Sequence, residues 1–131
     1  IICITNQSGI ARGFYKEKDL KSFMDYLNLR LLNSIGYELD RYYFCPHHPD
    51  GIIKEYSYLC DCRKPATGLF EKACHEFNID CKKSIFIGDK LSDLQAAESM
   101  KIKTIYFYSP SNIIYENQRY IPINHIEKVK L

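Results

Sequence analysis

The fold is decided by the segment from Ser84 to Tyr108, which has the sequence SIFIGDKLSDLQAAESMKIKTIYFY. It begins with a short apolar run that ends in Gly88-Asp89, continues with a helical pattern over 93–100, and closes with a second β-branched and aromatic run over 103–108. Strands that alternate with helices are typical of a parallel sheet. We therefore expect an α/β fold of the Rossmann-like kind, a parallel sheet with helices on both faces.

The residues before this segment show the same alternation of strand and helix patterns. Gly36 is expected to stop the first helix, and Thr67 is a suitable N-cap for the second. The tail after Pro110 is rich in tyrosine and has no clear pattern. The elements predicted here are strands over 1–5 and 41–44 and helices over 16–35 and 67–77.

Size and composition are those of one ordinary globular domain. The chain has 131 residues, of which 46% are hydrophobic and 26% charged, and its formal net charge is only +2. This charge gives no dense basic field for nucleic acid. No apolar run is long enough to span a bilayer, and the start has no signal-peptide pattern. We expect residues 1–131 to form a single domain, a cytoplasmic monomer without nucleic-acid or membrane partners.

Three of the six cysteines lie close together in the sequence, beside a pair of histidines. The loop over 45–65 that carries them has no periodicity, and a loop of this length in a compact domain is usually held by something. Two close pairs of sulfur and imidazole ligands suit tetrahedral zinc, and a closed shell of four has a structural role. Buried, unliganded cysteines are the alternative. The candidate zinc ligands are Cys45, either His47 or His48, Cys60 and Cys62.

Arg63 and Lys64 follow the second cysteine pair directly. A zinc-bound loop would hold these two cations rigidly beside the strand ends. Arginine binds phosphoryl oxygens through two N–H groups, and lysine supplies a compact positive charge. Taken alone, such a pair is usually a solvated surface feature. Next to the zinc loop, we interpret it as a phosphate-binding pair.

Two further strand ends carry polar groups. Asp89 ends a predicted strand and offers the hard oxygen that magnesium prefers, whereas Asp93 is either the N-cap of the next helix or a group outside the first metal shell. The run Thr5–Ser8 offers hydroxyl, amide and backbone donors for phosphate oxygens. Ligand sites in parallel sheets lie at the carboxyl ends of the strands, where Thr5, Cys45 and Asp89 are expected to gather.

Four stretches in this order resemble a known family. They are Thr5–Gly13, Cys45–Pro49, Cys60–Pro65 and Gly88–Lys90. The chain resembles the heptose-bisphosphate phosphatases of the haloacid dehalogenase superfamily, whose close relatives are the histidinol-phosphate phosphatases. The resemblance extends from Ile1 to about Tyr108, and the zinc loop that runs into Arg-Lys-Pro is particular to this branch.

The resemblance implies a role for individual residues. The hydroxyl of Thr5 would bind the transferred phosphoryl group, and Lys64 would stabilise its charge. Asp89 would be a ligand of Mg²⁺, and the choice of His47 over His48 as the zinc ligand rests mainly on the family pattern. The implied substrate-binding residues are Asn6, Gln7, Ser8, Arg63 and Lys90. The implied Zn²⁺ ligands are Cys45, His47, Cys60 and Cys62.

The chain departs from the family at its start. The family begins with an Asp-x-Asp strand whose first aspartate attacks phosphorus, and no such strand precedes Ile1. The resemblance therefore implies an N-terminally truncated chain that lacks the nucleophile and a central strand between those at Ile1 and Ser84. We expect the complete protein to be the enzyme, a phosphoric monoester hydrolase that forms an aspartyl phosphate, and this chain alone to be inactive.

The family resemblance implies removal of the 7-phosphate of D-glycero-D-manno-heptose 1,7-bisphosphate, a sugar phosphate of lipopolysaccharide precursor biosynthesis. This choice over histidinol phosphate rests on the continuation Ser8-Gly9-Ile10-Ala11-Arg12-Gly13. A noncatalytic, zinc-stabilised module that binds phosphate is a third hypothesis, from a different class of function.

Overall fold

The computed structural model describes residues 1–109 and 120–125. The chain divides into two compact units, Ile1–Arg63 and Lys64–Leu131, which are described separately below. In the described ranges, none of the helices has the length and apolar character needed to cross a membrane.

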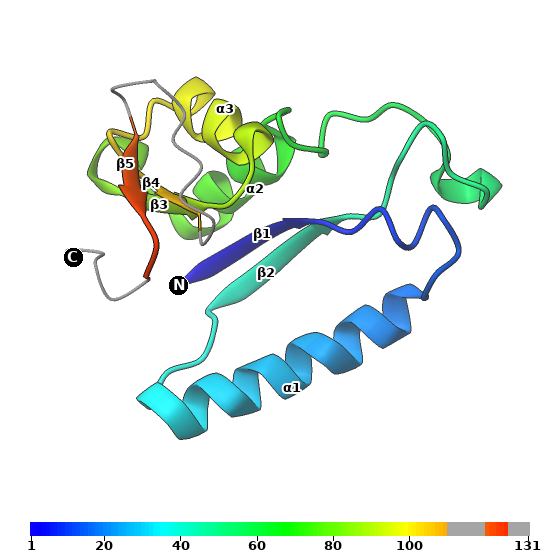
Figure 1. Ribbon diagram of the computed structural model, residues 1–131, viewed down its shortest axis with the longest axis horizontal. Helices are drawn as coiled ribbons and strands as arrows, with labels where there is room; N and C mark the ends of the chain where they lie inside the picture. The colour runs from blue at the N-terminus through cyan, green and yellow to red at the C-terminus, as the bar shows by residue number, and fades with distance from the viewer. Residues whose placement is uncertain (110–119, 126–131) are drawn as a thin grey trace. The chain divides into compact units, whose positions relative to one another are not determined.

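The first unit contains two parallel strands and a long helix. Strand β1 (Ile2–Asn6) pairs with β2 (Arg41–Cys45), so that the last residues of the two strands, Asn6 and Cys45, are partners. Helix α1 (Glu17–Ile35) runs alongside this pair (Figure 1). The loop that follows β2 contains only one short 3-10 helix, η1 (Lys54–Tyr56).

Both ends of α1 follow from the sequence. The carboxylate of Asp19 accepts a hydrogen bond of 2.8 Å from the backbone N–H of Lys16, which precedes the helix. Gly36 ends it in the left-handed conformation, with φ 73°, as predicted. The buried residues are Leu20 and Met24, which join a core cluster with Ile10. The other apolar positions of the predicted helix face contribute less to this core, and Phe23 is 56% exposed.

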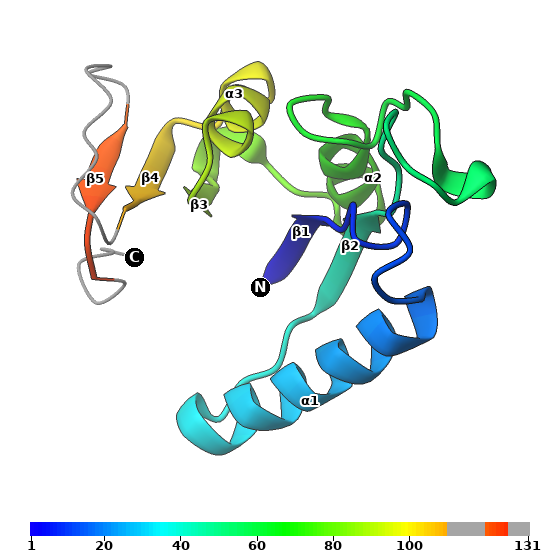
Figure 2. The same cartoon turned by 45° about the vertical axis from the view of Figure 1, so that its right-hand side comes forward.

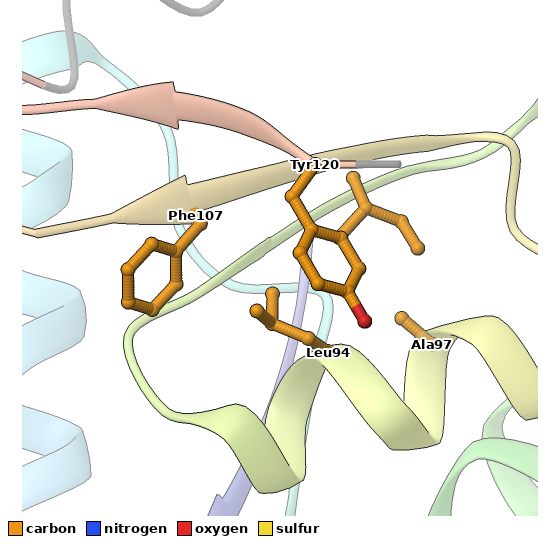
Figure 3. Close-up of a cluster of buried hydrophobic side chains, with 5 residues drawn as sticks. Leu94, Ala97, Phe107 and Tyr120 are labelled. Atoms are coloured by element: carbon orange, nitrogen blue, oxygen red, sulfur yellow. The ribbon is translucent and has the colours of Figure 1, made fainter. Parts of the chain in front are cut away.

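The second unit contains helices and strands in alternation. Its elements are α2 (Gly68–Phe77), η2 (Cys81–Lys83), β3 (Ile85–Gly88), α3 (Leu91–Ser99), β4 (Thr104–Tyr108) and β5 (Ile121–Ile123). The three strands form a parallel sheet with the order β3-β4-β5 (Figure 2). The core is formed by Leu94, Ala97, Ile105, Phe107 and Tyr120, which join α3 to the sheet (Figure 3).

The predicted α/β class with parallel strands is confirmed, although the described strands form two sheets in place of one. The strand predicted to lie between those at Ile1 and Ser84 stays a prediction. Strand β5 was not predicted, because it has only three residues and Pro122 stands at its centre. The rest of the tail, 110–119 and 126–131, lies outside the described residues.

Of the two residues considered as helix N-caps, Thr67 lies at that position and Asp93 does not. Thr67 stands at the N-cap position of α2 but has helical dihedral angles, and its hydroxyl donates to the Glu71 carboxylate in place of accepting a backbone N–H. Helix α3 begins at Leu91, so Asp93 is its third residue and not its N-cap. From this position the Asp93 carboxylate accepts the backbone N–H of Lys90, which precedes the helix.

Candidate metal and phosphate sites

A cluster of three cysteines and one histidine forms in the first unit. Cys45 is the last residue of β2, and the other three lie in the loop that follows. The Sγ atoms of Cys45 and Cys60 are 3.5 Å apart, and those of Cys60 and Cys62 are 3.2 Å apart. The Nδ1 atom of His47 lies 3.6 Å from Cys45 Sγ and 3.2 Å from Cys62 Sγ. All four potential ligand atoms fall within 4.8 Å of one another.

This geometry fits zinc. A tetrahedron with Zn–S bonds of about 2.3 Å and a Zn–N bond of about 2.1 Å has edges of roughly 3.6–3.8 Å, slightly longer than the contacts seen here. Burial raises the pKa of Cys45, so its thiol resists losing a proton unless a cation compensates. Three sulfurs and one imidazole nitrogen leave no open position in a four-coordinate shell, so the cluster suits a structural ion.

The groups around His47 orient its ring. Its Nε2 atom, on the far side of the ring from the sulfurs, lies 2.6 Å from the hydroxyl of Tyr58, and the two rings are 4.4 Å apart between centroids. The guanidinium of Arg63 donates to the backbone carbonyl of His47 over 3.3 Å. An outer partner of this kind fixes which imidazole nitrogen faces the ligand site. The sequence analysis missed Tyr58, because nothing in its spacing distinguishes it from the other tyrosines.

His48, the competing zinc ligand, lies outside the cluster. Its Nε2 atom is 3.2 Å from the guanidinium of Arg12, and its Nδ1 atom accepts the backbone N–H of Asp50 over 3.1 Å. The structure therefore brings His47, and not His48, to the cysteines. The zinc-ligand role itself stays a prediction.

The run Thr5–Ser8 lies at the carboxyl ends of the paired strands of the same unit, as predicted. The backbone N–H of Gln7 donates to the carbonyl of Cys45 over 2.8 Å, which ties this loop to the end of β2. The side-chain amide of Gln7 donates to Thr5 Oγ1 over 2.9 Å and accepts from the hydroxyl of Tyr15. The carbonyl of Ser8 accepts the N–H of Arg12 in the following turn.

A buried ion pair organises the second unit. The ammonium group of Lys64 lies 2.8 Å from Oδ1 of Asp93, and the two residues are only 8% and 5% exposed. The other carboxylate oxygen of Asp93 accepts the backbone N–H groups of Asp89 and Lys90 over 3.2 and 3.0 Å. Burial acts to raise the pKa of Asp93, but the hydrogen bond and positive charge of Lys64 outweigh it, so the pKa is lowered and the carboxylate stays ionised.

Asp93 therefore joins two predicted site elements, the lysine and the turn that carries Asp89. Both of its oxygens are occupied within the protein, which leaves Asp89 as the better candidate for a metal ligand. Asp89 and Lys90 are exposed at the end of β3. Gly88 is required beside them, because a Cβ atom there would lie 2.6 Å from Cβ of Asp93. A single exposed carboxylate fits Mg²⁺, which usually keeps several waters.

The other three cysteines are not in the cluster. Cys74 and Cys81 of the second unit have their Sγ atoms 3.0 Å apart, and both are free thiols. Burial and the neighbouring thiol of Cys81 raise the pKa of Cys74 to about 12. Cys3 packs in β1 against the core of the first unit. The expectation that these are core or surface thiols agrees with these positions.

The predicted site residues fall into both compact units. Thr5 to Ser8, the cysteine–histidine cluster and Arg63 belong to the first, and Lys64, Asp89 and Lys90 belong to the second. Within the first unit, the donor loop and the cluster meet at the ends of β1 and β2. Within the second, Asp93 brings Lys64 to the turn at Asp89.

Comparison with known proteins shows which proteins this chain is similar to. A family model described as HAD-hydrolase-like matches residues 61–109. The chain is 45% identical over 104 residues to D-glycero-beta-D-manno-heptose-1,7-bisphosphate 7-phosphatase of Yersinia pestis, an alignment that covers 79% of this chain and 55% of the relative. It is 47% identical over 98 residues to D-glycero-alpha-D-manno-heptose-1,7-bisphosphate 7-phosphatase of Photorhabdus laumondii. This alignment covers 75% of this chain and 53% of the relative.

A solved structure is similar as well. The D,D-heptose 1,7-bisphosphate phosphatase from B. bronchiseptica, complexed with magnesium and phosphate, matches with a TM-score of 0.71 and 28% identity, over 92% of this chain and 66% of that one. The resemblance inferred from the motifs is thus confirmed, and the fold is that of the haloacid dehalogenase phosphatases. The chain spans about half the length of the curated relatives it matches.

Proposed function

We propose that the protein containing this chain is a phosphatase that removes the 7-phosphate of D-glycero-D-manno-heptose 1,7-bisphosphate. The observation that carries the proposal is the position of Lys64, whose ammonium group is held by the same buried carboxylate that holds the turn of Asp89. A fixed cation and an exposed carboxylate around one turn are two of the groups that phosphoryl transfer uses. The identity to heptose 1,7-bisphosphate phosphatases supports the substrate.

In this proposal each predicted residue has one task. Lys64 neutralises charge on the transferring phosphoryl group, since its ammonium is a compact positive charge that Asp93 holds in place. Arg63 and Lys90 bind other oxygens of the substrate. Thr5 donates its hydroxyl hydrogen to a phosphoryl oxygen. The remaining members of the donor loop, Asn6, Gln7 and Ser8, line the substrate.

Two metals complete the proposal. Asp89 would hold Mg²⁺, which neutralises phosphoryl charge when bound. Magnesium is present in the similar structure from B. bronchiseptica. Cys45, His47, Cys60 and Cys62 would hold a structural zinc ion, since their ligand atoms already lie at nearly tetrahedral spacings.

We further propose a cytoplasmic monomer that acts on a small sugar phosphate and has no nucleic-acid partner. Free thiols arranged to bind metal suit a reducing compartment. The small net charge of +2 argues against a polyanionic partner. Equilibrium sedimentation of the full-length protein checks the monomer, and a shift toward dimer mass at micromolar concentration would contradict it.

The substrate assignment is tested by the full-length protein on three compounds. With Mg²⁺ present, we expect kcat/KM for heptose 1,7-bisphosphate to exceed that for histidinol phosphate by at least about 100-fold, the discrimination available to a site with matched polar contacts. Phosphorus NMR should show loss of the 7-phosphate and retention of the 1-phosphate. Both anomers are assayed, because relatives of each preference are about equally similar to this chain. Dominant turnover of histidinol phosphate would overturn the proposal.

A further inference from the structure

Three side chains of the first unit form one chain of hydrogen bonds that ends at Thr5. The hydroxyl of Tyr15 donates to Oε1 of Gln7, and Nε2 of Gln7 donates to Oγ1 of Thr5 over 2.9 Å. The chain therefore leads from Tyr15 to the residue proposed to contact the phosphoryl group.

The first link sets the direction of the second. The hydroxyl of Tyr15 has a single hydrogen, and it donates this hydrogen to Oε1 of Gln7. The carbonyl side of the Gln7 amide is then occupied, and its nitrogen faces Thr5. Because Thr5 Oγ1 accepts from Gln7, its own hydrogen is left to donate. With the amide of Gln7 turned over, Thr5 would have to donate to it and would offer a phosphoryl oxygen only lone pairs.

Packing fixes the ring of Tyr15 in the required place. A Cβ atom on Gly9 would lie only 2.2 Å from Cε1 of Tyr15, so only glycine allows this approach. The ring also packs against the cluster of Ile10, Leu20 and Met24. Burial raises the pKa of Tyr15, so its hydroxyl keeps the proton that it donates.

We propose that Tyr15 is a positioning residue of the phosphatase, which orients the side chain of Gln7 so that the hydroxyl of Thr5 donates a hydrogen bond to the transferred phosphoryl group. This inference rests on the proposed function, because it needs a phosphoryl group at Thr5. It assigns Gln7 a role within the protein as well as toward substrate. An amide nitrogen has two hydrogens, so one is left after the bond to Thr5.

The test is a double-mutant cycle in the full-length enzyme with Tyr15→Phe and Gln7→Met, which remove the hydrogen-bonding groups and nearly keep the side-chain shapes. We expect Tyr15→Phe to lower kcat about tenfold, the effect of one neutral hydrogen bond, and to change KM less than threefold. In the Gln7→Met background the same change should lower kcat less than twofold. Tyr37→Phe, at an exposed tyrosine of the same unit, is the matched control.

An equal loss of kcat in both backgrounds, or no loss at all, would overturn the inference, because Tyr15 would then act without Gln7. A second readout is independent of turnover. The side-chain amide protons of Gln7, assigned by their absence in Gln7→Met, should shift in the NMR spectrum of Tyr15→Phe and not in that of Tyr37→Phe. Unshifted resonances would contradict the relay. A wild-type enzyme without activity on heptose 1,7-bisphosphate would instead contradict the proposed function, and the NMR result would still decide the relay.

Discussion

The two units hold their functional turns in different ways. In the first, the loop between β2 and Arg63 has one short 3-10 helix and little core, and its apolar residues Ile52 and Leu59 are 78% and 84% exposed. Four potential metal ligands meet at one point of this loop. In the second, the turn at Asp89 lies between a strand and a helix with a shared core, and Asp93 of a buried ion pair accepts its backbone N–H groups. An irregular loop needs strong local bonds, whereas regular elements supply most of the order themselves.

The two units also differ in what their functional turns need in order to be held in place. The first loop has backbone hydrogen bonds of its own, such as those from Ile52 and Ile53 to the carbonyl of Ala11, and we expect a bound ion to add to its order. The turn of the second unit depends only on the chain. Arg63 and Lys64 follow Cys62 directly in the sequence, so we expect metal binding at the cluster to affect these two residues, which are proposed to bind phosphate.

The largest effect is expected from Cys60→Ser in the full-length protein. Loss of an outer-shell partner of a metal site weakens metal binding by up to about 100-fold. Loss of a direct ligand should cost more, so we expect zinc binding to weaken by more than about 100-fold. Zinc affinity by chelator competition, together with hydrogen exchange over residues 46–62, measures it. Cys81→Ser, outside the cluster, is the control. If Cys60→Ser and Cys81→Ser bind zinc equally well, Cys60 is not a zinc ligand and the first loop is not held by a metal.

The second largest effect is expected from Asp93→Asn. Because the Lys64 ammonium would lose its buried partner, we expect the free energy of unfolding to fall by about 3–5 kcal/mol. Urea denaturation of the full-length protein measures this value. Lys83→Gln removes an exposed pair with Asp80 in the same unit, at 3.8 Å, and should change stability by less than about 0.5 kcal/mol. If the two variants are equally stable, the ion pair does not hold the turn.

The sequence predicted these two regions to different degrees. The cysteine–histidine cluster could be predicted because its ligands lie within one short stretch and their chemistry is rare at that spacing. The pair Lys64–Asp93 could not, because the two residues are far apart in the sequence and each has many possible partners. The sequence instead suggests an N-cap or a role outside the first metal shell for Asp93, since a helix start is uncertain by a residue or two without its cap geometry.

The sheet and core show the same limit. Apolar strands and the stop at Gly36 follow from local preferences, so their bounds were predicted to within a residue or two. Burial depends on which neighbours cover a helix, and periodicity alone does not show these neighbours. The apolar spacing of α1 therefore predicted more buried residues than the helix has, and Phe23 is largely exposed. Tyr15 and Tyr58 were missed, because their roles arise from contacts that only the folded chain brings together.

A third prediction contrasts the thiols of the two units by alkylation with iodoacetamide at pH 8. Chelation of zinc should make Cys60 reactive, because the metal no longer masks its sulfur. Cys74 should stay slow with or without chelator, since a pKa near 12 leaves little thiolate at this pH. We expect Cys74 to react roughly 30-fold more slowly than in urea-unfolded protein, after allowing for the higher nucleophilicity of a basic thiolate. Peptide mass spectrometry gives the rates, and equal rates for Cys74 in both states would refute this.

The smallest effect is expected from Tyr58→Phe. Loss of the hydroxyl partner of His47 Nε2 should weaken zinc binding about tenfold without removing it, as for other outer-shell partners. The competition assay used for Cys60→Ser measures the change, with Tyr37→Phe as control. If Tyr58→Phe lowers zinc affinity as much as Cys60→Ser does, Tyr58 holds the whole loop in place and does more than orient the ring of His47.

We propose that a metal bound to the cysteine–histidine cluster of the first unit fixes the residues proposed to bind phosphate. The most direct measurement is the affinity of the full-length protein for inorganic phosphate, by calorimetry in constant Mg²⁺, before zinc extraction, after verified extraction and after zinc is restored. We predict that affinity falls at least about tenfold on extraction, as expected when supporting metal contacts are lost, and returns on refilling. Unchanged affinity in verified zinc-free protein would contradict the account.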